Sequence, residues 1–398
     1  MNRLSKRVQR LSYSQTFVMS NTARAMKAEG IDVISLTLGE PDFDVPEKIK
    51  QAAKQAIDEN YSHYSPVAGF LELRQAVCHK LKRDNQLHYE PTQICVSTGA
   101  KQSISNVLAA LIDEGDEVIL PTPYWVSYDE MVKMMGGTSV FVETNINTDF
   151  KLTPEQIEQA ITPNTRAILF SSPCNPSGSF YSYEELEALA NVLAKYPEVI
   201  IISDEIYEFL NYEGQHTSIA QFPQVFAQTV VVNGVSKAYA MTGWRIGYCA
   251  APQWLASACD KIQGQVTSGA NTIAQRASIT ALEMDPKELQ PMIDKFKQRR
   301  DLAYQLVSEI PGFKCNLPKG AFYLFPDISY YIGKTLGDTE IKNSDDFAMF
   351  LLEHAHVATV GGVSFGDDRC IRFSYATSDE VIKEAMKRIK DCLAPYAV

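Results

Sequence analysis

Short hydrophobic runs alternate with stretches of helical periodicity through the middle of this chain. Apolar, β-rich runs occur at residues 93–97, 117–120, 139–142, 167–170, 199–202, 230–233 and 245–250. Helical patterns lie between most of these runs, for example at residues 100–112, 124–135 and 183–193. Strands that alternate with helices usually pair in parallel. The pattern therefore predicts the α/β fold class, with a mainly parallel sheet and helices on both of its faces.

The pattern changes beyond about residue 281 and predicts a second, smaller α+β domain. A long charged helix is expected at 291–309, then short strands near 322–325 and 370–374, then a terminal helix. A stretch rich in proline and acidic residues at 39–46 marks the passage from the N-terminal segment into the large domain. We predict an N-terminal arm that contributes to the small domain at 1–45, a large ligand-binding domain at 46–285 and a small C-terminal domain at 286–398.

Length, composition and charge narrow the possible function classes. With 398 residues and 45% hydrophobic content, the chain exceeds the size at which one core keeps growing, so two domains are expected. The net charge of -11 argues against nucleic-acid binding. No segment approaches the roughly 20 apolar residues of a membrane span, and we expect a soluble, cytoplasmic protein. The basic residues near the N-terminus favour an N-terminal arm over a transit peptide, because serines are few there and no cleavage-like break follows.

The cysteines and histidines do not indicate a metal site. The eight cysteines lie far apart with no C-x-x-C pair, which is typical of a reduced cytosolic protein. They are Cys78, Cys95, Cys174, Cys249, Cys259, Cys315, Cys370 and Cys392. His354 and His356 lie where a helical pattern passes into a strand, and we interpret them as packed or solvated side chains. No bound metal is expected.

Polar residues and glycines gather at five of the predicted strand ends. In parallel sheets, ligands bind beyond the carboxyl ends of the strands, where helix N-termini offer free N–H groups to anions. Ser-Thr-Gly-Ala-Lys follows the first run, Pro-Tyr-Trp the second, Ser-Ser-Pro-Cys-Asn-Pro-Ser-Gly the fourth, Ser-Asp-Glu-Ile-Tyr the fifth and Gly-Val-Ser-Lys the sixth. We expect these five segments to build one site.

Lys237 follows the sixth run, directly after Ser236 and shortly before Arg245. A lysine amine bonds to an aldehyde, while a hydroxyl and a guanidinium bind a phosphate. This combination suits a cofactor that carries both an aldehyde and a phosphate. Taken alone, the same residues are equally compatible with a surface lysine and a structural arginine.

Four motifs together resemble the class I aminotransferases of pyridoxal-phosphate (PLP) fold type I. They are the segment from Ser236 to Gly247, Ser-Pro-x-Asn-Pro-x-Gly at 172–178, Ser-Asp-Glu-Ile-Tyr at 203–207 and Arg-x-Ser-Tyr at 372–375. The likeness runs from Gly39 to the terminal helix and is greatest to the bacterial-type branch, which contains many aspartate aminotransferases. It implies PLP as the cofactor, held by Lys237 as a Schiff base.

The resemblance also implies roles for the residues around the cofactor ring. Asp204 corresponds to the aspartate that keeps the pyridine nitrogen protonated, although alone it suits a helix cap. Tyr207 corresponds to the phenol that hydrogen-bonds the ring oxygen, and Asn175 to the amide that bridges this oxygen and the substrate carboxylate. Trp125 corresponds to the aromatic residue that stacks on the ring. Outside the family context, these three side chains would be assigned to a core or a turn.

The resemblance implies that the cofactor phosphate lies at the start of the helix that follows the first apolar run. Gly99, Ala100 and Lys101 open this helix, and its free N–H groups favour an anion. Ser236 and Arg245 are expected to complete the phosphate site. Tyr64 resembles the tyrosine that reaches the phosphate from a neighbouring subunit, which implies a homodimer with shared active sites.

Substrate recognition requires a receptor for the α-carboxylate. Arg372 corresponds to the family's arginine, whose planar fork binds a carboxylate bidentately, and Arg369 is a rival only by its proximity in sequence. Gly39 is expected to contact the same carboxylate through its backbone. The chain lacks the arginine with which animal-type relatives bind a side-chain carboxylate, so Lys101 and Arg276 are candidates for that contact.

The resemblance implies a ping-pong transfer of an amino group between an L-amino acid and a 2-oxo acid. The amine of Lys237, with its pKa lowered by nearby cations and partial burial, is expected to remove the α-proton. We expect L-aspartate and 2-oxoglutarate as the substrates, with aromatic or prephenate-type substrates as the alternative. A PLP-dependent lyase on the same fold is a second alternative, because a fold does not fix the reaction type.

Overall fold

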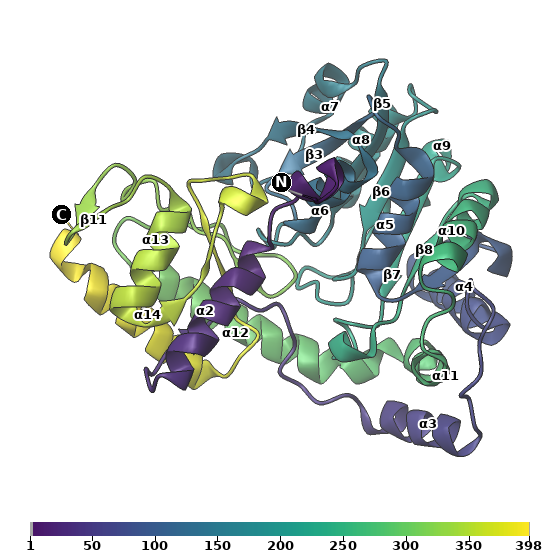
Figure 1. The fold of residues 1–398 in the computed structure, drawn as a ribbon, viewed down its shortest axis with the longest axis horizontal. Helices are drawn as coiled ribbons and strands as arrows, with labels where there is room; N and C mark the ends of the chain where they lie inside the picture. Colours follow the sequence, from purple (N-terminus) through teal and green to yellow (C-terminus); the bar gives the residue numbers. More distant parts are fainter. Residues whose placement is uncertain (1–2, 398) are drawn as a thin grey trace.

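The large lobe of the molecule is built on a seven-stranded sheet (Figure 1). The structure, a computed structural model, describes residues 3–397. The strands, in spatial order, are β2 (Ile94–Ser97), β8 (Gly247–Ala250), β7 (Thr229–Gly234), β6 (Ile200–Asp204), β5 (Thr165–Ser171), β3 (Glu117–Thr122) and β4 (Thr138–Glu143). β8 runs antiparallel to β2 and β7, whereas the neighbouring pairs from β7 to β4 are parallel. The predicted α/β class with a mainly parallel sheet is confirmed.

Both faces of this sheet are buried, because the central strands carry apolar side chains on both sides. In β6, Ile202 packs into the cluster that includes helix α5 (Ala100–Leu111), whereas its neighbour Ile201 packs into the cluster that includes α8 (Tyr183–Leu193). Successive side chains of a strand point to opposite faces, so this division follows from the strand geometry. Burial of a side chain of this size contributes about 1.5–3 kcal/mol to stability.

Further helices complete the two layers. On the α5 face lie α6 (Ser127–Met135) and α10 (Gln253–Val266), and on the α8 face lies α7 (Pro154–Ala160). A third apolar cluster joins strands β2, β7 and β8 to α3 (Glu47–Asp58), α4 (Leu71–Asn85) and α11 (Thr272–Glu283). The short helix α9 (Pro223–Phe226) contributes Val225 to the α8-face cluster, whereas α1 (Lys6–Gln9) has no buried residue.

The structure corrects two predicted element boundaries. The strand predicted at 245–250 begins at Gly247, because Arg245 has a φ of 57° in the left-handed region and closes a short 3-10 turn. The helix predicted at 124–135 begins at Ser127, because the preceding loop turns toward the other lobe and the Tyr124 N–H bonds the Phe365 carbonyl. Both corrections fall at strand ends, where tertiary contacts override the local pattern.

A second lobe contains the C-terminal part of the chain. Helices α12 (Gln290–Ser308), α13 (Ser344–Phe350) and α14 (Asp379–Leu393) lie there with an antiparallel sheet of β13 (Val360–Gly361), β14 (Ile371–Ser374) and β9 (Tyr323–Leu324). The short strands β10 (Thr335–Leu336) and β11 (Thr339–Glu340) form a separate hairpin. The core of this lobe is aromatic-rich and includes Phe296, Phe322, Phe347 and Phe373.

The N-terminal segment begins beside α6 of the large lobe and then packs on the second lobe (Figure 1). Helix α2 (Gln15–Ala28) contributes Met19 and Ala23 to an apolar cluster with Leu352 and Ala358. Strand β1 (Ile34–Ser35) then pairs in parallel with β12 (Val357–Ala358). The predicted boundaries after residues 45 and 285 remain predictions.

Within residues 3–397, no helix is long and apolar enough to cross a membrane. The eight cysteines are free thiols. His354 packs against Phe350, with ring centroids 4.5 Å apart.

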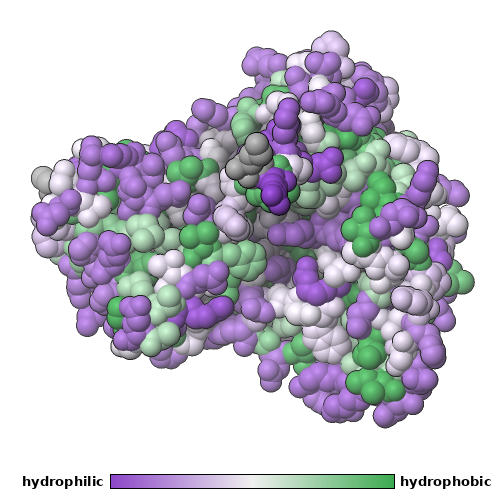
Figure 2. All heavy atoms as spheres, viewed as in Figure 1, coloured by the Kyte–Doolittle hydropathy of each residue, from purple (hydrophilic) through white to green (hydrophobic). Residues whose placement is uncertain are grey.

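The two lobes meet at the carboxyl ends of the parallel strands. Segments that follow β2, β3, β5, β6 and β7 face the second lobe at this edge of the sheet. Figure 2 shows the surface hollowed between the lobes, with hydrophilic residues along the recess. The fold therefore directs the polar strand-end segments into one cleft.

Candidate active site

A cavity of about 510 Å³ lies in the cleft between the two lobes. Most of the predicted site residues line it: Gly39, Ala100, Lys101, Trp125, Asn175, Asp204, Tyr207, Ser236, Lys237, Arg245 and Arg372. Gly99 and Tyr64 do not belong to the lining. The expectation that the strand ends build one site agrees with this arrangement.

Lys237 lies in the loop that follows β7 and is partly buried. Its Nζ donates a hydrogen bond of 2.6 Å to the carbonyl oxygen of Gly39. Burial lowers the pKa of Lys237 to about 8; Arg372 and Arg245 act in the same direction, whereas Glu40 acts against them. An amine with this pKa is unprotonated to a useful extent near neutral pH, as a nucleophile or a general base requires.

Asp204 ends strand β6 and is 4% exposed. The Tyr128 hydroxyl donates to its Oδ2 at 2.7 Å, and the Ile206 N–H donates to its Oδ1 at 3.2 Å. Burial raises the pKa of this carboxyl to about 6, although both donors lower it. A carboxylate in such a setting gains from a partner that brings a positive charge or a shared proton.

Arg372 is 2% exposed and occupies strand β14. Its Nη1 donates to Asn175 Oδ1 at 2.9 Å and its Nη2 to the Thr37 carbonyl at 2.5 Å. The guanidinium lies 4.6 Å from the Tyr323 ring centroid and 4.9 Å from that of Phe365. Its Nε is buried without a hydrogen-bond partner. Burial lowers the pKa of Arg372, whereas Tyr323 and Tyr207 raise it, and no carboxylate within residues 3–397 pairs with this guanidinium.

Two phenols meet on the second-lobe side of the cavity. The hydroxyls of Tyr207 and Tyr323 are 2.7 Å apart and hydrogen-bonded. Burial raises the pKa of both tyrosines. A side chain at Gly39 would collide with the Tyr323 hydroxyl, so the backbone at residue 39 approaches this pair closely. The site thus presents two neutral hydroxyls beside the amine of Lys237.

The start of helix α5 forms an anion-binding cradle. Gly99 is the N-cap residue with a φ of 81°, and a Cβ there would collide with the guanidinium of Arg245. A Cβ at Gly247 would likewise collide with the backbone of Ala100. The first N–H groups of a helix have no carbonyl partner within it, and they attract anions. Together with the Ser236 hydroxyl and Arg245, this helix end is suited to a phosphate.

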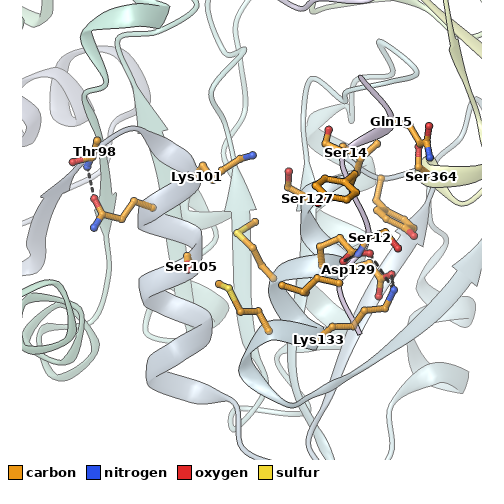
Figure 3. Close-up of a pocket in the computed structure, with 18 of the residues that line it drawn as sticks. Ser12, Ser14, Gln15, Thr98, Lys101, Ser105, Ser127, Asp129, Lys133 and Ser364 are labelled. Carbon is orange, nitrogen blue, oxygen red and sulfur yellow. Dashed lines mark hydrogen bonds and ion pairs between the residues drawn. The ribbon is translucent and has the colours of Figure 1, made fainter. Parts of the chain in front are cut away.

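Lys101 lines both this cavity and a larger hollow of about 810 Å³, whose lining Figure 3 shows. Its Nζ lies 4.8 Å from the ring centroid of Trp125. Burial lowers the pKa of Lys101, and the nearby charge of Arg245 lowers it further. Ser14 from the N-terminal segment and Ser127 from α6 also border both spaces. A cation is therefore available where a substrate side chain would project.

Comparison with known proteins identifies the family. The model for aminotransferase class I and II matches residues 31–389. An aspartate/prephenate aminotransferase of Cereibacter sphaeroides is 48% identical over 390 residues, covering 97% of this chain and 98% of the relative. An aspartate aminotransferase of Geobacillus stearothermophilus is 44% identical, with 97% and 98% covered. The crystal structure of the Rhizobium meliloti aspartate aminotransferase superimposes with a TM-score of 0.95 at 42% identity, covering 99% of each chain.

The chain belongs to the class I and II aminotransferases. The predicted family, the fold type I architecture and the assignment as an aminotransferase rather than a lyase are confirmed. The cofactor is PLP, as the sequence motifs imply.

The cavity of this aminotransferase has the groups that PLP requires. The α5 cradle with Arg245 suits the phosphate, Lys237 offers an amine of lowered pKa to the aldehyde, and the buried Asp204 suits a ring nitrogen. The close approach of backbone at Gly99 to Arg245 leaves no room for a side chain, in keeping with a cradle that a ligand group fills. The residues present fit the cofactor.

The cavity lining does not include Tyr64, Arg369 or Arg276. Tyr64 is 95% exposed. Arg369 is not part of the lining, because its guanidinium makes a bidentate contact of 2.8 and 3.0 Å with Asp367. Arg276 lies over the Tyr61 ring at 4.7 Å and does not line the cavity either. Among the two candidates for a distal carboxylate, only Lys101 borders this space in the described chain.

Two residues of the site were missed by the sequence reasoning. Tyr128, which holds Asp204, lies one helical turn after Trp125, so the helical period offered a signal for it. Tyr323, which bonds Tyr207, comes from a short strand of the second lobe. Nothing in the sequence near Tyr323 indicates a partner 116 residues away.

Proposed function

We propose that this aminotransferase transfers the amino group of L-aspartate to 2-oxoglutarate in a ping-pong reaction. The observation that carries the proposal is the buried guanidinium of Arg372, which has an unpartnered Nε and lines the same cavity as Lys237. Such a group is suited to a carboxylate. The names of the relatives, aspartate aminotransferase and aspartate/prephenate aminotransferase, support the same substrate.

We assign to Lys237 the covalent hold on PLP and the transfer of the substrate's α-proton. When bound, PLP takes up the amino group at its aldehyde carbon and draws electrons into its ring. The pKa of about 8 supports the proton transfer, because Nζ is then partly unprotonated near neutral pH. After it is displaced by the substrate, Nζ stays within the cavity, where it is able to take the proton and return it.

We assign the control of the ring to Asp204, Tyr207, Asn175 and Trp125. Asp204 is proposed to hold a proton on the ring nitrogen, and its orientation by Tyr128 at 2.7 Å supports this role. Tyr207 and Asn175 are proposed to donate to the ring oxygen, since both line the cavity beside Lys237. Trp125 is proposed to stack on the ring from the α6 side.

We assign the phosphate to the helix cradle. Gly99 and Ala100 are proposed to offer backbone N–H groups, Ser236 a hydroxyl and Arg245 a guanidinium. Tyr64 is proposed to reach the phosphate of a second subunit in a homodimer. Its 95% exposure supports this role, because an aromatic residue on a subunit surface gains from burial in an interface.

Substrate binding is proposed to use both ends of a dicarboxylate. Arg372, Asn175 and the backbone of Gly39 surround the α-carboxylate position, and Lys101 is proposed to bind the distal carboxylate. Prephenate is the second candidate substrate, because relatives at 48% and 46% identity carry the name aspartate/prephenate aminotransferase. The hollow of about 810 Å³ beyond Lys101 supports a substrate bulkier than aspartate.

A half-reaction screen tests the substrate proposal. Each amino acid is mixed with the PLP-loaded enzyme in the absence of a 2-oxo acid, and the absorbance of the cofactor is followed. L-aspartate and L-glutamate are expected to convert the cofactor fastest. When 2-oxo acids are then added to the converted enzyme, 2-oxoglutarate and prephenate are expected to restore the original absorbance. Faster conversion by apolar amino acids than by aspartate would contradict the dicarboxylate assignment. Accumulation of ammonia from aspartate would contradict amino-group transfer.

We further propose that the enzyme resides in the cytoplasm. The eight free cysteines support this location, since free thiols persist in reducing compartments.

A further inference from the structure

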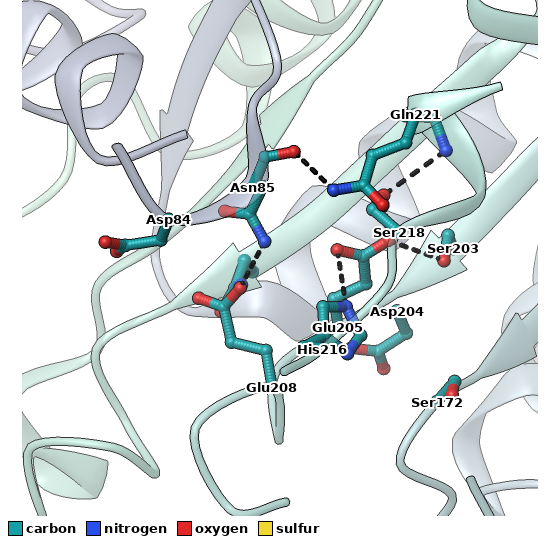
Figure 4. A network of polar contacts seen from close by, with 12 residues as sticks. Asp84, Asn85, Ser172, Ser203, Asp204, Glu205, Glu208, His216, Ser218 and Gln221 are labelled. Atoms are coloured by element: carbon teal, nitrogen blue, oxygen red, sulfur yellow. Dashed lines mark hydrogen bonds and ion pairs between the residues drawn. The ribbon is translucent and has the colours of Figure 1, made fainter. Parts of the chain in front are cut away.

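A buried polar network lies behind strand β6, on the side away from the cofactor cavity (Figure 4). At its centre is Glu205, the residue directly after Asp204, which is 1% exposed. Its backbone N–H continues the sheet ladder by bonding the Val232 carbonyl at 2.8 Å. Successive side chains of an extended chain point to opposite sides. Asp204 therefore lines the cavity while Glu205 points into the network.

The carboxylate of Glu205 has three hydrogen-bond partners. The hydroxyls of Ser203 and Ser218 donate to its Oε1 at 2.9 and 2.6 Å. His216 Nε2 lies 3.1 Å from its Oε2. Within the described residues, neither a lysine nor an arginine forms an ion pair with Glu205. This carboxylate group is thus fixed in place by hydrogen bonds and not by a strong cation.

The neighbouring acid, Glu208, is paired differently. The Lys80 ammonium contacts its Oε1 and donates to Asn85 Oδ1 at 2.7 Å, while Asn85 Nδ2 donates to Glu208 Oε2 at 2.9 Å. Lys80 is 1% exposed, so this pair is fully removed from water. One carboxylate oxygen each of Glu205 and Glu208 and one ring nitrogen of His216, the atoms that could bind a metal ion, lie within 4.8 Å of one another. We assign no metal to them, because Lys80 already supplies the cation and hydrogen bonds satisfy Glu205.

We propose that Glu205 is a positioning residue of the aminotransferase, which acts through its buried negative charge on Asp204. A nearby negative charge disfavours loss of the proton that Asp204 shares with the ring nitrogen of PLP. This proton is therefore held more firmly. This inference rests on the role proposed above for Asp204. Glu205 touches neither cofactor nor substrate, and it also fixes the chain direction immediately after Asp204 through its three hydrogen bonds.

The electrostatics of the surrounding groups agree with this geometry. Burial is the main cause of the raised pKa of Asp204, and the charge of Glu205 raises it as well, whereas Tyr128 and Lys237 lower it. The charge of Glu205 also contributes to the raised pKa of Tyr89. The titratable groups around the two carboxyls in the described chain are Lys80, Tyr89, Tyr128, Cys174, Tyr207, Glu208, His216, Lys237 and Tyr248.

The experiment uses the complete enzyme loaded with PLP that carries ¹⁵N in its ring. The ¹⁵N chemical shift reports ring protonation as a function of pH, and the low-field proton resonance of the Asp204 hydrogen bond gives a second reading at one pH. In Glu205→Gln, which is nearly isosteric, the midpoint of ring deprotonation is expected to fall by about one pH unit. The low-field resonance is expected to move upfield. If neither reading changes in the folded variant, the proposal is overturned.

Two further variants separate the charge of Glu205 from packing and hydrogen bonding. In His216→Gln, an amide donor replaces the imidazole and the charge of Glu205 stays, so the ring is expected to keep its proton at least as firmly as in the wild type. A fall of the same size as in Glu205→Gln would overturn the proposal. If Glu205→Gln alone does not fold, the double variant Glu205→Gln/His216→Gln supplies a neutral amide pair in the same space. It is expected to show the fall of about one pH unit, and wild-type behaviour would overturn the proposal.

Asp204→Asn distinguishes a failure of this inference from a failure of the proposed site. Loss of the protonated ring signal in Asp204→Asn, together with wild-type behaviour of Glu205→Gln, would contradict the role of Glu205 alone. Retention of the wild-type ring signal in Asp204→Asn would contradict the role of Asp204, and the inference with it. The expected result is that Asp204→Asn loses the protonated signal and Glu205→Gln shows an intermediate change.

Discussion

At Arg372, burial and function oppose each other. A guanidinium that is 2% exposed has lost its hydration, yet its partners in the chain are an amide, a carbonyl and two aromatic rings, without a carboxylate. Such a group is costly in the empty enzyme and gains when a carboxylate binds. On the proposed function, the substrate's α-carboxylate supplies the negative charge that pairs with this buried guanidinium.

Arg372→Ala is expected to raise KM for aspartate and to lower kcat/KM by about 30-fold to several thousandfold, which corresponds to a loss of about 2–5 kcal/mol. The physical reason is the loss of a desolvated charge pair with the carboxylate. Steady-state kinetics with aspartate measure the effect. Arg369→Ala is the matched control, because this arginine pairs with Asp367 outside the cavity and its loss should leave KM unchanged. Equal effects of the two substitutions would contradict the assignment.

Asp204 is expected to lower the free energy of unfolding of the apoenzyme as the pH rises. Its folded-state pKa is about 6, raised from the usual 3.8, so its favourable contribution is complete below the usual value and is lost as the pH rises through 6. The loss amounts to about 3 kcal/mol at most. Without PLP, Asp204→Asn should therefore gain stability over the wild type as the pH rises from about 4 to about 7, with little further change above that. Urea unfolding of both apoenzymes at each pH measures this difference.

The comparison with PLP bound serves as the control for Asp204. The cofactor should stabilise the wild type more than the asparagine variant, since only the carboxylate shares a proton with the ring. A difference between the two apoenzymes that stays constant with pH would contradict the raised pKa.

At the scale of elements, periodicity predicted much of the frame. The helix expected at 183–193 matches α8, because Ser182 forms a capping box with Glu185 and the apolar face is regular. The errors fall at Arg245, whose left-handed φ closes a 3-10 turn, and at the start of α6, where the Tyr124 N–H bonds the Phe365 carbonyl of the other lobe. Most site residues found from motifs lie at or just after the strand ends of the large lobe, whereas Arg372 lies within β14 of the second lobe. Tyr323 escaped because its partner lies in a different lobe, and pair contacts of this kind leave no local pattern.

Gly99→Ala tests the cradle at the start of α5. A methyl group there collides with Arg245, and the φ of 81° adds backbone strain. We expect the dissociation constant of PLP to rise on the order of tenfold, because the guanidinium is displaced from the phosphate position. Gly115→Ala is the matched control, since Gly115 also has a positive φ, 100°, but nothing lies within 4 Å of the added methyl. This control should lose about 1 kcal/mol of stability and keep its affinity for PLP.

At the scale of the whole molecule, the cavity lies between two lobes, each with its own apolar core, and both lobes contribute residues to its lining. Its cofactor-side residues come from the strand ends of the large lobe, whereas Arg372 and Tyr323 come from the second lobe. A relative movement of the lobes would therefore shift Arg372, the proposed α-carboxylate contact, relative to Lys237. It would leave the phosphate cradle unchanged, because the cradle lies within the large lobe. Tyr64 is the one predicted site residue that stands fully at the surface, which is the basis of the proposed dimer.

Subunit complementation tests the shared site. Lys237→Ala inactivates the subunit that carries it, and Tyr64→Ala is expected to weaken PLP binding in the neighbouring subunit. A mixed dimer of the two variants contains one site with both Lys237 and Tyr64 intact. Mixing the unfolded variants and refolding them together should restore activity well above that of either variant refolded alone. Activity equal to the average of the two, or a monomeric enzyme in solution, would contradict a site shared between subunits.

The most direct test of the site is the covalent bond between Lys237 and PLP. Borohydride reduction of the loaded enzyme should fix one PLP per subunit, and mass spectrometry of the peptides should find it on Lys237. In Lys237→Ala, the fixed cofactor should disappear while the protein stays folded. A full equivalent of PLP fixed on another lysine, such as Lys101, in either protein would contradict the assignment on which the proposed mechanism rests.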